Sequence, residues 1–315
     1  MAKTRILSAD SGGISQAAEL LRAGSLVAIP TETVYGLAAD ARNDHAVAGI
    51  FAAKGRPTFN PLIVHLPDPT EAARIAHLPA PAEALARAFW PGALTLVLPL
   101  RPDAGISPLV TAGGDTVALR VPAHPVAQAL LRQTGPLAAP SANPSGRISA
   151  STAAHVLDGL DGRIAAVLDA GPCAVGLEST IIGWREGHAT LLRPGGISSD
   201  AIEAISGPLD RPQINAGADA RPDAPGQLTS HYAPRQPLRM GATTAHEGEI
   251  LIGFGPGPAD MNLSPSGNLV EAAANLFATL HRADAMGRPI AVTPIPDTGL
   301  GLAINDRLRR AAAPR

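Results

Sequence analysis

A lysine stands where this chain would be expected to use arginine. The segment KGRPTFNPL, residues 54–62, holds Lys54; the only other lysine is Lys3, and the remaining 23 of the 25 basic residues are arginine. The pattern HAVAGIFAAKGR predicts a helix that ends here, where the helix dipole favours a cation. Arginine would serve that role equally well, whereas lysine is a compact charge with three donors, suited to a crowded polyphosphate site. Both interpretations stay open from the residues alone. In the polyphosphate interpretation, Arg56 and Asn60 of the same segment would add a guanidinium fork and an amide to the site.

Two further polar stretches follow apolar runs. PTETVYGLAAD, residues 30–40, carries Thr33 after the run SLVAI, and PLAAPSANPSGRIS, residues 136–149, carries Ser141 and Asn143 in a proline-stiffened loop. Open α/β sheets bind ligands at strand ends, and hydroxyls, amides and backbone N–H groups can line a phosphate pocket. An ordinary turn capped by hydroxyls is the alternative for each stretch.

Arg120 lies inside the otherwise apolar run DTVALRVPAHP, residues 115–125. A buried arginine needs a partner. That partner is either a carboxylate of the core or the carboxylate of a substrate held by the guanidinium fork. The residues alone do not decide between them.

Several classes of protein are excluded by motif or composition. The chain has no Gly-x4-Gly-Lys-Ser/Thr loop, no His-Glu-x-x-His and no Gly-x-Ser-x-Gly. Cys173 is the only cysteine, so neither a disulfide framework nor a cysteine zinc site can form. A net charge of −2 argues against phosphate-backbone binding as the main role. With no signal-peptide pattern and no apolar run of membrane-spanning length, we expect a cytoplasmic protein without a membrane partner.

Apolar segments bounded by glycine or proline predict strands, and helical patterns lie between several of them. The predicted strands are SLVAIP, PLIVHL, ALTLVLPL, TVALRVP, IAAVLDAG, STIIGW and ATLLRPG. The predicted helices cover residues 14–24, 45–56 and 124–135. This alternation predicts an α/β domain.

Three regions follow one another along the chain. Residues 1–206 form the α/β domain, and residues 207–235 read as a linker, because GPLDRPQINAGADARPDAPG has no periodicity. Residues 236–315 predict a smaller α/β unit with strands EILIGFG and PIAVTPIP and helices over 268–287 and 301–312. The linker ends in PGQLTSHYAP, whose polar and aromatic cluster predicts a lid over the site.

Eight segments in order resemble the long form of the threonylcarbamoyl-AMP synthase family. They are PTETVYGL, KGRPTFNPLIVH, FWPGALTLVL, VALRVPAHP, APSANPSG, GLESTIIG, LLRPGGI and APGQLTSHYAP. The resemblance covers about residues 15–235 and implies a twisted mixed or parallel YrdC-like sheet with helices, a linker and a smaller Rossmann-like α/β domain. Phe59 stands where the family often has a polar residue, a departure expected to change the rim of the pocket.

The resemblance also implies a reaction and its residues. L-threonine, bicarbonate and ATP would give threonylcarbamoyl-AMP and pyrophosphate, for the t6A modification of tRNA at adenosine 37. The implied catalytic set is Lys54, Arg56, Ser141 and Asn143. The implied ATP contacts are Arg56, Asn60, Thr116, Ser141, Ser149, Arg193 and Tyr232. The implied threonine contacts are Thr33, His65, Arg120, Ala139 and Ser179.

The remaining expectations concern cofactor and partners. Mg²⁺ would be carried by ATP rather than by protein ligands, and the product would pass to the tRNA threonylcarbamoyl-transferase machinery, with weak tRNA contact. An alternative is a YrdC-like RNA-binding module without synthase activity, which salt-sensitive tRNA binding would reveal. A carbamoyl-transfer domain of the hydrogenase-maturation type would carry zinc-finger-like modules, which one cysteine does not allow.

Overall fold

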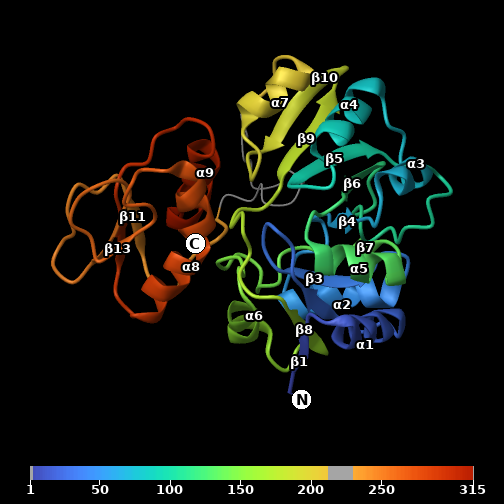
Figure 1. The fold of residues 1–315 in the computed structure, drawn as a ribbon, viewed down its shortest axis with the longest axis horizontal. Coiled ribbons are helices and arrows are strands. Elements are labelled where there is room, and N and C mark those ends of the chain that lie inside the picture. Colours follow the sequence, from blue (N-terminus) through green and yellow to red (C-terminus); the bar gives the residue numbers. More distant parts are fainter. Residues whose placement is uncertain (1–2, 212–229, 315) are drawn as a thin grey trace.

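The computed structural model describes residues 3–211 and 230–314 (Figure 1). Residues 212–229, which include most of the predicted linker and the first half of PGQLTSHYAP, lie outside the described residues. The described stretches form a large α/β unit and a smaller one, coloured orange to red in Figure 1. The predicted α/β fold, with a large mixed sheet and a small parallel one, is confirmed.

Within the described residues, ten strands form the large sheet in the order β1-β8-β2-β3-β7-β4-β6-β5-β9-β10. The sheet is mixed: it has parallel pairs (β1 with β8, β4 with β6, β5 with β9) and antiparallel ones such as β2 with β3 and β5 with β6. The strands are β1 (Arg5–Ser8), β2 (Val27–Ile29), β3 (Gly36–Asp40), β4 (Ile63–His65), β5 (Leu94–Pro99), β6 (Thr116–Arg120), β7 (Leu137–Ala138), β8 (Ala166–Asp169), β9 (Thr180–Arg185) and β10 (His188–Arg193).

Helices pack on this sheet, with α1 against α5 and α4 against α7. Polar caps and glycines set their ends: the Asn43 side chain caps α2, and Gly55, with φ 61°, ends it in the left-handed conformation that glycine favours. The helices are α1 (Ser11–Arg22), α2 (Asp44–Lys54), the 3-10 turn η1 (Pro69–Glu71), α3 (Ala72–Ile75), α4 (Ala80–Phe89), α5 (Pro125–Thr134), α6 (Ala153–Leu160) and α7 (Ser199–Ser206).

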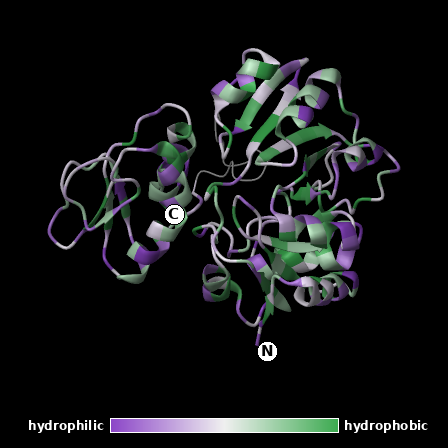
Figure 2. Cartoon of the chain, in the orientation of Figure 1, coloured by the Kyte–Doolittle hydropathy of each residue, from purple (hydrophilic) through white to green (hydrophobic). Residues whose placement is uncertain are grey.

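The smaller unit has a parallel sheet in the order β11-β14-β12-β13. Its elements are β11 (Leu238–Met240), β12 (Ile250–Gly253), β13 (Met261–Asn262), α8 (Leu269–Ala285), β14 (Ile290–Val292) and α9 (Gly301–Ala312). Both helices contribute buried apolar residues to a cluster that also contains strand residues such as Ile250 and Ile290. Figure 2 shows hydrophobic residues, in green, on these strands and helices.

One apolar cluster crosses from the large unit to the small one. Val34, Ile148 and Leu177 of the large unit pack in the same buried cluster as Leu276 and Phe277 of α8. The two units therefore share a core. A further cross-unit contact is aromatic: the rings of His155 (α6) and His281 (α8) stack with centroids 3.9 Å apart.

Each strand and helix predicted from the sequence is present with bounds shifted by a few residues, and α9 matches the predicted 301–312. The sequence reasoning missed β3, because it took GLAAD as part of a polar loop; the segment instead forms a hairpin with β2. It also missed short or weakly patterned elements such as β1, β7, α4 and α6. Among the described helices, none combines the length and apolar character needed to cross a bilayer.

Candidate active site

A hollow of about 520 Å³, including the part open to solvent, lies where several polar segments meet. The segments come from the β2–β3 hairpin, the region around β4, the end of β6, the loop after β7, the start of β9, the end of β10 and the chain just before β11. Its lining residues are Thr31, Thr33, Val34, Gly36, Arg56, Ile63, His65, Arg120, Ala139, Pro140, Ser141, Glu178, Ser179, Arg193, His231 and Tyr232.

Sheet topology explains why distant residues meet here. β4 and β6 are parallel and in register, so His65 lies opposite Arg120. The loop after β7 is fastened to β3 by two backbone hydrogen bonds, from Leu37 N–H to the Pro140 carbonyl and from Ala142 N–H to the Tyr35 carbonyl. At this crossing a Cβ on Gly36 would lie 3.2 Å from the Ala139 Cβ, so the close approach favours glycine.

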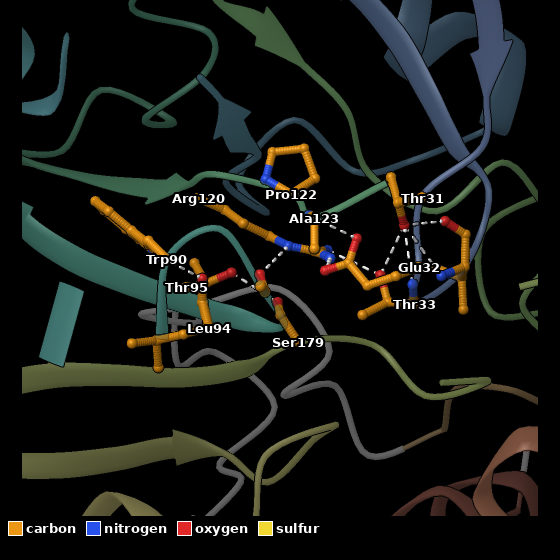
Figure 3. Close-up of polar contacts among 12 residues, drawn as sticks. Thr31, Glu32, Thr33, Trp90, Leu94, Thr95, Arg120, Pro122, Ala123 and Ser179 are labelled. Carbon is orange, nitrogen blue, oxygen red and sulfur yellow. Dashed lines mark hydrogen bonds and ion pairs between the residues drawn. The ribbon is translucent and has the colours of Figure 1, made fainter. Parts of the chain in front are cut away.

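Arg120 is held by a network from three directions (Figure 3). Its Nη2 donates to Glu32 at 2.5 Å, its Nη1 to the Thr33 hydroxyl at 2.8 Å, and its Nε to the Gly92 carbonyl at 3.1 Å. Burial would raise the pKa of Glu32, but the charge and hydrogen bond of Arg120 hold it below its usual value. Of the two partners that the sequence left open, the structure shows the core carboxylate, and a substrate carboxylate would have to share these donors.

Lys54 ends α2 with its side chain buried against the loop after β7. Its Nζ donates to the backbone carbonyls of Ser141, at 2.5 Å, and Asn143. Burial, and then the charge of Arg56, hold the pKa of Lys54 well below its usual value. The ammonium thus lies directly behind the loop that lines the hollow, although Lys54 does not itself line it.

Arg56 faces the hollow and is also deeply buried. Its Nη2 donates to the Pro61 carbonyl at 2.9 Å and its Nε to the Asn60 carbonyl at 3.3 Å. Burial, and then the charge of Arg193, lower its pKa to about 10. Within residues 3–211 and 230–314, no carboxylate lies at ion-pair distance from either Lys54 or Arg56. Among these residues, no nearby acid neutralises either cation.

Arg193, at the end of β10, and Ser179, just before β9, contact each other in the wall of the hollow. Arg193 donates to the Ser179 carbonyl at 2.9 Å and to its hydroxyl at 3.3 Å, and that hydroxyl also pairs with the Thr95 hydroxyl at 2.6 Å. The Ser179 side chain is therefore oriented by two neighbours (Figure 3 shows the Thr95 contact).

Several buried polar atoms around the hollow have no hydrogen-bond partner among the described residues. They include His65 Nδ1, His231 Nδ1 and the Tyr232 hydroxyl, all on lining residues. Burial is the main cause that lowers the pKa of both histidines to about 3, so both rings are neutral at physiological pH. Because buried polar groups are normally satisfied, their presence here indicates a polar occupant.

Most of the residues implied by the resemblance are brought together in this hollow. Those that line it are Thr33, Arg56, His65, Arg120, Ala139, Ser141, Ser179, Arg193 and Tyr232.

Five do not line it. Lys54 and Asn60 are buried behind it, and Ser149 donates its hydroxyl to Glu178. Asn143 turns its amide nitrogen to the carbonyls of Pro144 and Arg147, at 2.8 and 3.0 Å. Thr116 is set apart: it is exposed and lines a neighbouring hollow together with Phe59.

The sequence reasoning missed two charged residues at the site, Glu178 and Arg307. Glu178 was a carboxylate inside the apolar segment GLESTIIG, which was the available signal. Arg307 gave no such signal, because a helix so rich in arginine is typical of a solvent-exposed face. Tyr35, the tyrosine of PTETVYGL, is a core residue whose hydroxyl donates to the Gly171 carbonyl at 2.8 Å.

The donor set around the hollow suits a metal that arrives with its ligand. Its two nearby carboxylates, Glu32 and Glu178, are engaged by Arg120 and Arg307. No group of three or more histidine, cysteine or acidic side chains that could hold a metal occurs in the part of the chain that the structure describes. Mg²⁺ is commonly bound through substrate phosphates and water, which is the arrangement these residues fit.

Two family profiles match the chain in succession. Residues 19–195 match the profile described as Telomere recombination, and residues 197–313 match that of the threonylcarbamoyl-AMP synthase C-terminal domain. Threonylcarbamoyl-AMP synthase of Bacillus subtilis is 43% identical, over 98% of this chain and 95% of the relative. The enzyme of that name from Pyrococcus abyssi is 40% identical, over 95% of this chain and 94% of the relative.

Solved structures agree with the sequence matches. A Pyrococcus abyssi Sua5 structure complexed with L-threonine superposes with a TM-score of 0.90 at 38% identity, covering 98% of both chains. Escherichia coli YciO, at 22% identity and a TM-score of 0.55 over 62% of this chain, shares the fold of the larger unit.

Proposed function

Because the chain belongs to the threonylcarbamoyl-AMP synthase family, we propose that it converts L-threonine, bicarbonate and ATP to threonylcarbamoyl-AMP and pyrophosphate. The threonine amine and bicarbonate would form a carbamate with loss of water. A carbamate oxygen would then attack the α-phosphorus of ATP, and the bond to the leaving pyrophosphate would break. The enzyme is a nucleotidyltransferase by this chemistry.

The observation that carries the proposal is a pair of buried cations that have no carboxylate at ion-pair distance among the described residues. Lys54 and Arg56 are 3% and 8% exposed. The hydrogen-bond acceptors that the described residues offer to each charge are backbone carbonyls, which offset part of the free-energy cost of burying it. A buried charge is expensive unless it is paired. A polyphosphate that entered the hollow would supply the missing negative charge, and Arg193 would face it from the opposite strand, β10.

The opposite side of the hollow suits an amino acid. Arg120 offers a cationic fork, and Thr33 and Ser179 offer hydroxyls. The neutral ring of His65 has an unpartnered Nδ1 that can accept a hydrogen bond from a substrate hydroxyl or amine. The Pyrococcus abyssi relative was solved with L-threonine, which supports threonine as a ligand of this chain.

The protein's contribution to the chemistry is positioning and charge. Transfer of a nucleotidyl group needs negative charge to be stabilised on phosphate oxygens, which fixed cations in a dry site do well. Lys54, through its hold on the loop at Ser141, and Arg56, from the lining, would supply that stabilisation. A carbamate decomposes in water, so a hollow with buried walls also protects it.

Mg²⁺ bound to ATP would shield the triphosphate charge and orient it. Ser141 and Arg56, which line the hollow, are placed to contact the phosphates around such an ion. The proposed substrates favour a cytoplasmic location, and the unstable product would pass to the tRNA threonylcarbamoyl-transferase machinery. Weak tRNA contact at the mouth of the hollow would serve that transfer.

Pyrophosphate release tests the proposal. With ATP, Mg²⁺ and purified full-length protein, release should require both threonine and bicarbonate. Serine should be a weaker substrate, because a methyl group in an apolar pocket is worth about 1–3 kcal/mol, and valine weaker still, because it leaves buried polar partners unpaired. Equal rates with the three amino acids, or release without bicarbonate, would refute the assignment.

A further inference from the structure

We propose that Arg307, which the smaller unit contributes, is a positioning residue for the nucleotide side of the hollow. This inference rests on the proposed function and assigns a role to the C-terminal unit: it holds Glu178 and Tyr232, two lining residues of the hollow, in place from behind.

The first connection runs through Glu178. Arg307 on α9 is fully buried, and its Nε donates to Glu178 Oε2 at 2.8 Å across the boundary between the units. The other carboxylate oxygen of Glu178 accepts a hydrogen bond from the Ser149 hydroxyl. Glu178 lines the hollow, so a side chain of the small unit fixes a lining residue of the large one.

The second connection runs through Tyr232. The Arg307 guanidinium lies over the Tyr232 ring, 5.0 Å from its centroid, in cation–π geometry. Tyr232 has φ 61°, a conformation that non-glycine residues adopt only where surrounding contacts hold them. The backbone N–H of His231 donates to the Arg310 carbonyl of the same helix at 3.2 Å. Helix α9 therefore holds both the backbone and the ring at this point.

The charges around Arg307 are arranged to keep it fixed. Its Nη1 donates to Asp306 at 2.7 Å, and the neighbouring acids and Tyr232 raise its pKa above the usual value although burial opposes this. The charge of Arg307 in turn keeps the pKa of Glu178 low against the effect of burial. Without Arg307, Glu178 would be a buried carboxylate without its main cation, and we expect it to take up a proton or reorient.

A merely structural role is the rival explanation, because a buried ion pair between two units can act as a staple. Loss of a staple would lower stability and weaken every ligand alike. A positioning role predicts a split: the affinity for ATP falls, whereas the affinity for threonine, which is read by Arg120 and its neighbours, changes little.

The test uses the full-length chain and isothermal titration with Mg-ATP and, separately, with L-threonine. For Arg307→Met we expect ATP affinity to fall about tenfold or more, with the KM for ATP rising in parallel, and threonine affinity to change by less than twofold. Arg307→Lys should recover part of the loss, since it restores the charge but not the fork. The matched control is Arg309→Met on the same helix, an exposed arginine 3.7 Å from Asp297, which should change neither affinity.

A double variant covers the case in which Arg307→Met folds poorly. Glu178→Met with Arg307→Met replaces a buried ion pair by apolar side chains, which commonly restores stability. Recovered thermal stability with ATP affinity still at least tenfold low supports positioning. Affinity that returns with stability, equal loss for ATP and threonine, or unchanged ATP affinity in Arg307→Met overturns it. If the wild-type protein itself neither binds ATP nor releases pyrophosphate, the proposed function fails and this inference falls with it; if the wild type does both, only the role of Arg307 is at stake.

Discussion

Arg120 and Arg56 are both arginines buried beside the same hollow, and they differ in what surrounds them. The three guanidinium nitrogens of Arg120 donate hydrogen bonds to a carboxylate, a hydroxyl and a carbonyl, so its charge is balanced before any ligand arrives. Arg56 has two carbonyls, and its neighbouring charges are other cations. The side proposed for threonine is thus a completed network, whereas the side proposed for phosphate carries positive charge that no carboxylate at ion-pair distance balances in the part of the chain that the structure describes, and that an anion would neutralise.

Among the changes that test this contrast, we expect a substitution of Lys54 to have the largest effect. Lys54→Met removes the ammonium that holds the Ser141 loop from behind, and we expect turnover to fall about 10²-fold, the loss that a misplacement of about 1 Å in a site can cause. Lys54→Arg should also be impaired, because a larger fork cannot reach both carbonyls in a buried site. Steady-state pyrophosphate release measures both, and near-normal turnover in either variant would contradict a role on the phosphate side.

Opposite effects on stability should separate the two arginines. Arg120→Gln leaves Glu32 buried without its cation, and removing one partner of a buried pair costs about 3 kcal/mol or more. Arg56→Gln removes one of several like charges, so the free energy of unfolding should stay the same or rise while ATP binding falls. Urea unfolding without ligand measures the free energy of unfolding of both variants. An equal loss of stability in the two variants would contradict the contrast between these arginines.

Pyrophosphate alone should stabilise the protein by filling the phosphate side. At a concentration 100 times its dissociation constant, a ligand specific for the folded state adds about 2.7 kcal/mol. Thermal unfolding with and without pyrophosphate measures this gain. Arg56→Gln should reduce it strongly and Arg120→Gln should not. The same gain in both variants would place the anion elsewhere.

The smallest effect concerns pH on the threonine side. His65 has a pKa of about 3, because burial and then the charge of Arg120 disfavour the protonated ring. As pH falls below 6.5 the unfolded chain gains a proton that the folded chain does not, so each such histidine lowers the free energy of unfolding by about 1.4 kcal/mol per pH unit until the folded pKa is reached. Urea unfolding at pH 7, 6 and 5 should show a shallower loss in His65→Asn than in the wild type. The exposed His45→Asn is the matched control, and equal slopes in the His65 and His45 variants would contradict the assignment.

The sequence predicted the elements whose ends carry local signals. Pro125 and Gly135 bound α5, and Gly55 ends α2 at Lys54, because caps and left-handed glycines act within one turn. Residues of PTETVYGL, KGRPTFNPLIVH and APSANPSG line one hollow, as the resemblance led us to expect, and the resemblance could point to them because each motif is contiguous.

What the sequence could not predict depends on packing between distant segments. Glu178 and Arg307 form an ion pair although 129 positions separate them, and nothing near either residue in the sequence indicates the other as its partner. β3 looked like a loop because its alanines carry little strand signal, and only pairing with β2 and β7 makes it a strand. Thr116 shares an apolar strand with Arg120, yet its end of β6 opens into a different hollow.

The apolar cluster that Val34, Ile148 and Leu177 share with α8 has a thermodynamic consequence. Units with separate cores can melt one after the other, whereas units that share one core lose much of their apolar burial together. A calorimetric scan of this chain should therefore show a single endotherm whose van't Hoff and calorimetric enthalpies agree. Heat would abolish the catalytic unit and its neighbour in the same cooperative step, so neither serves as a thermally independent module.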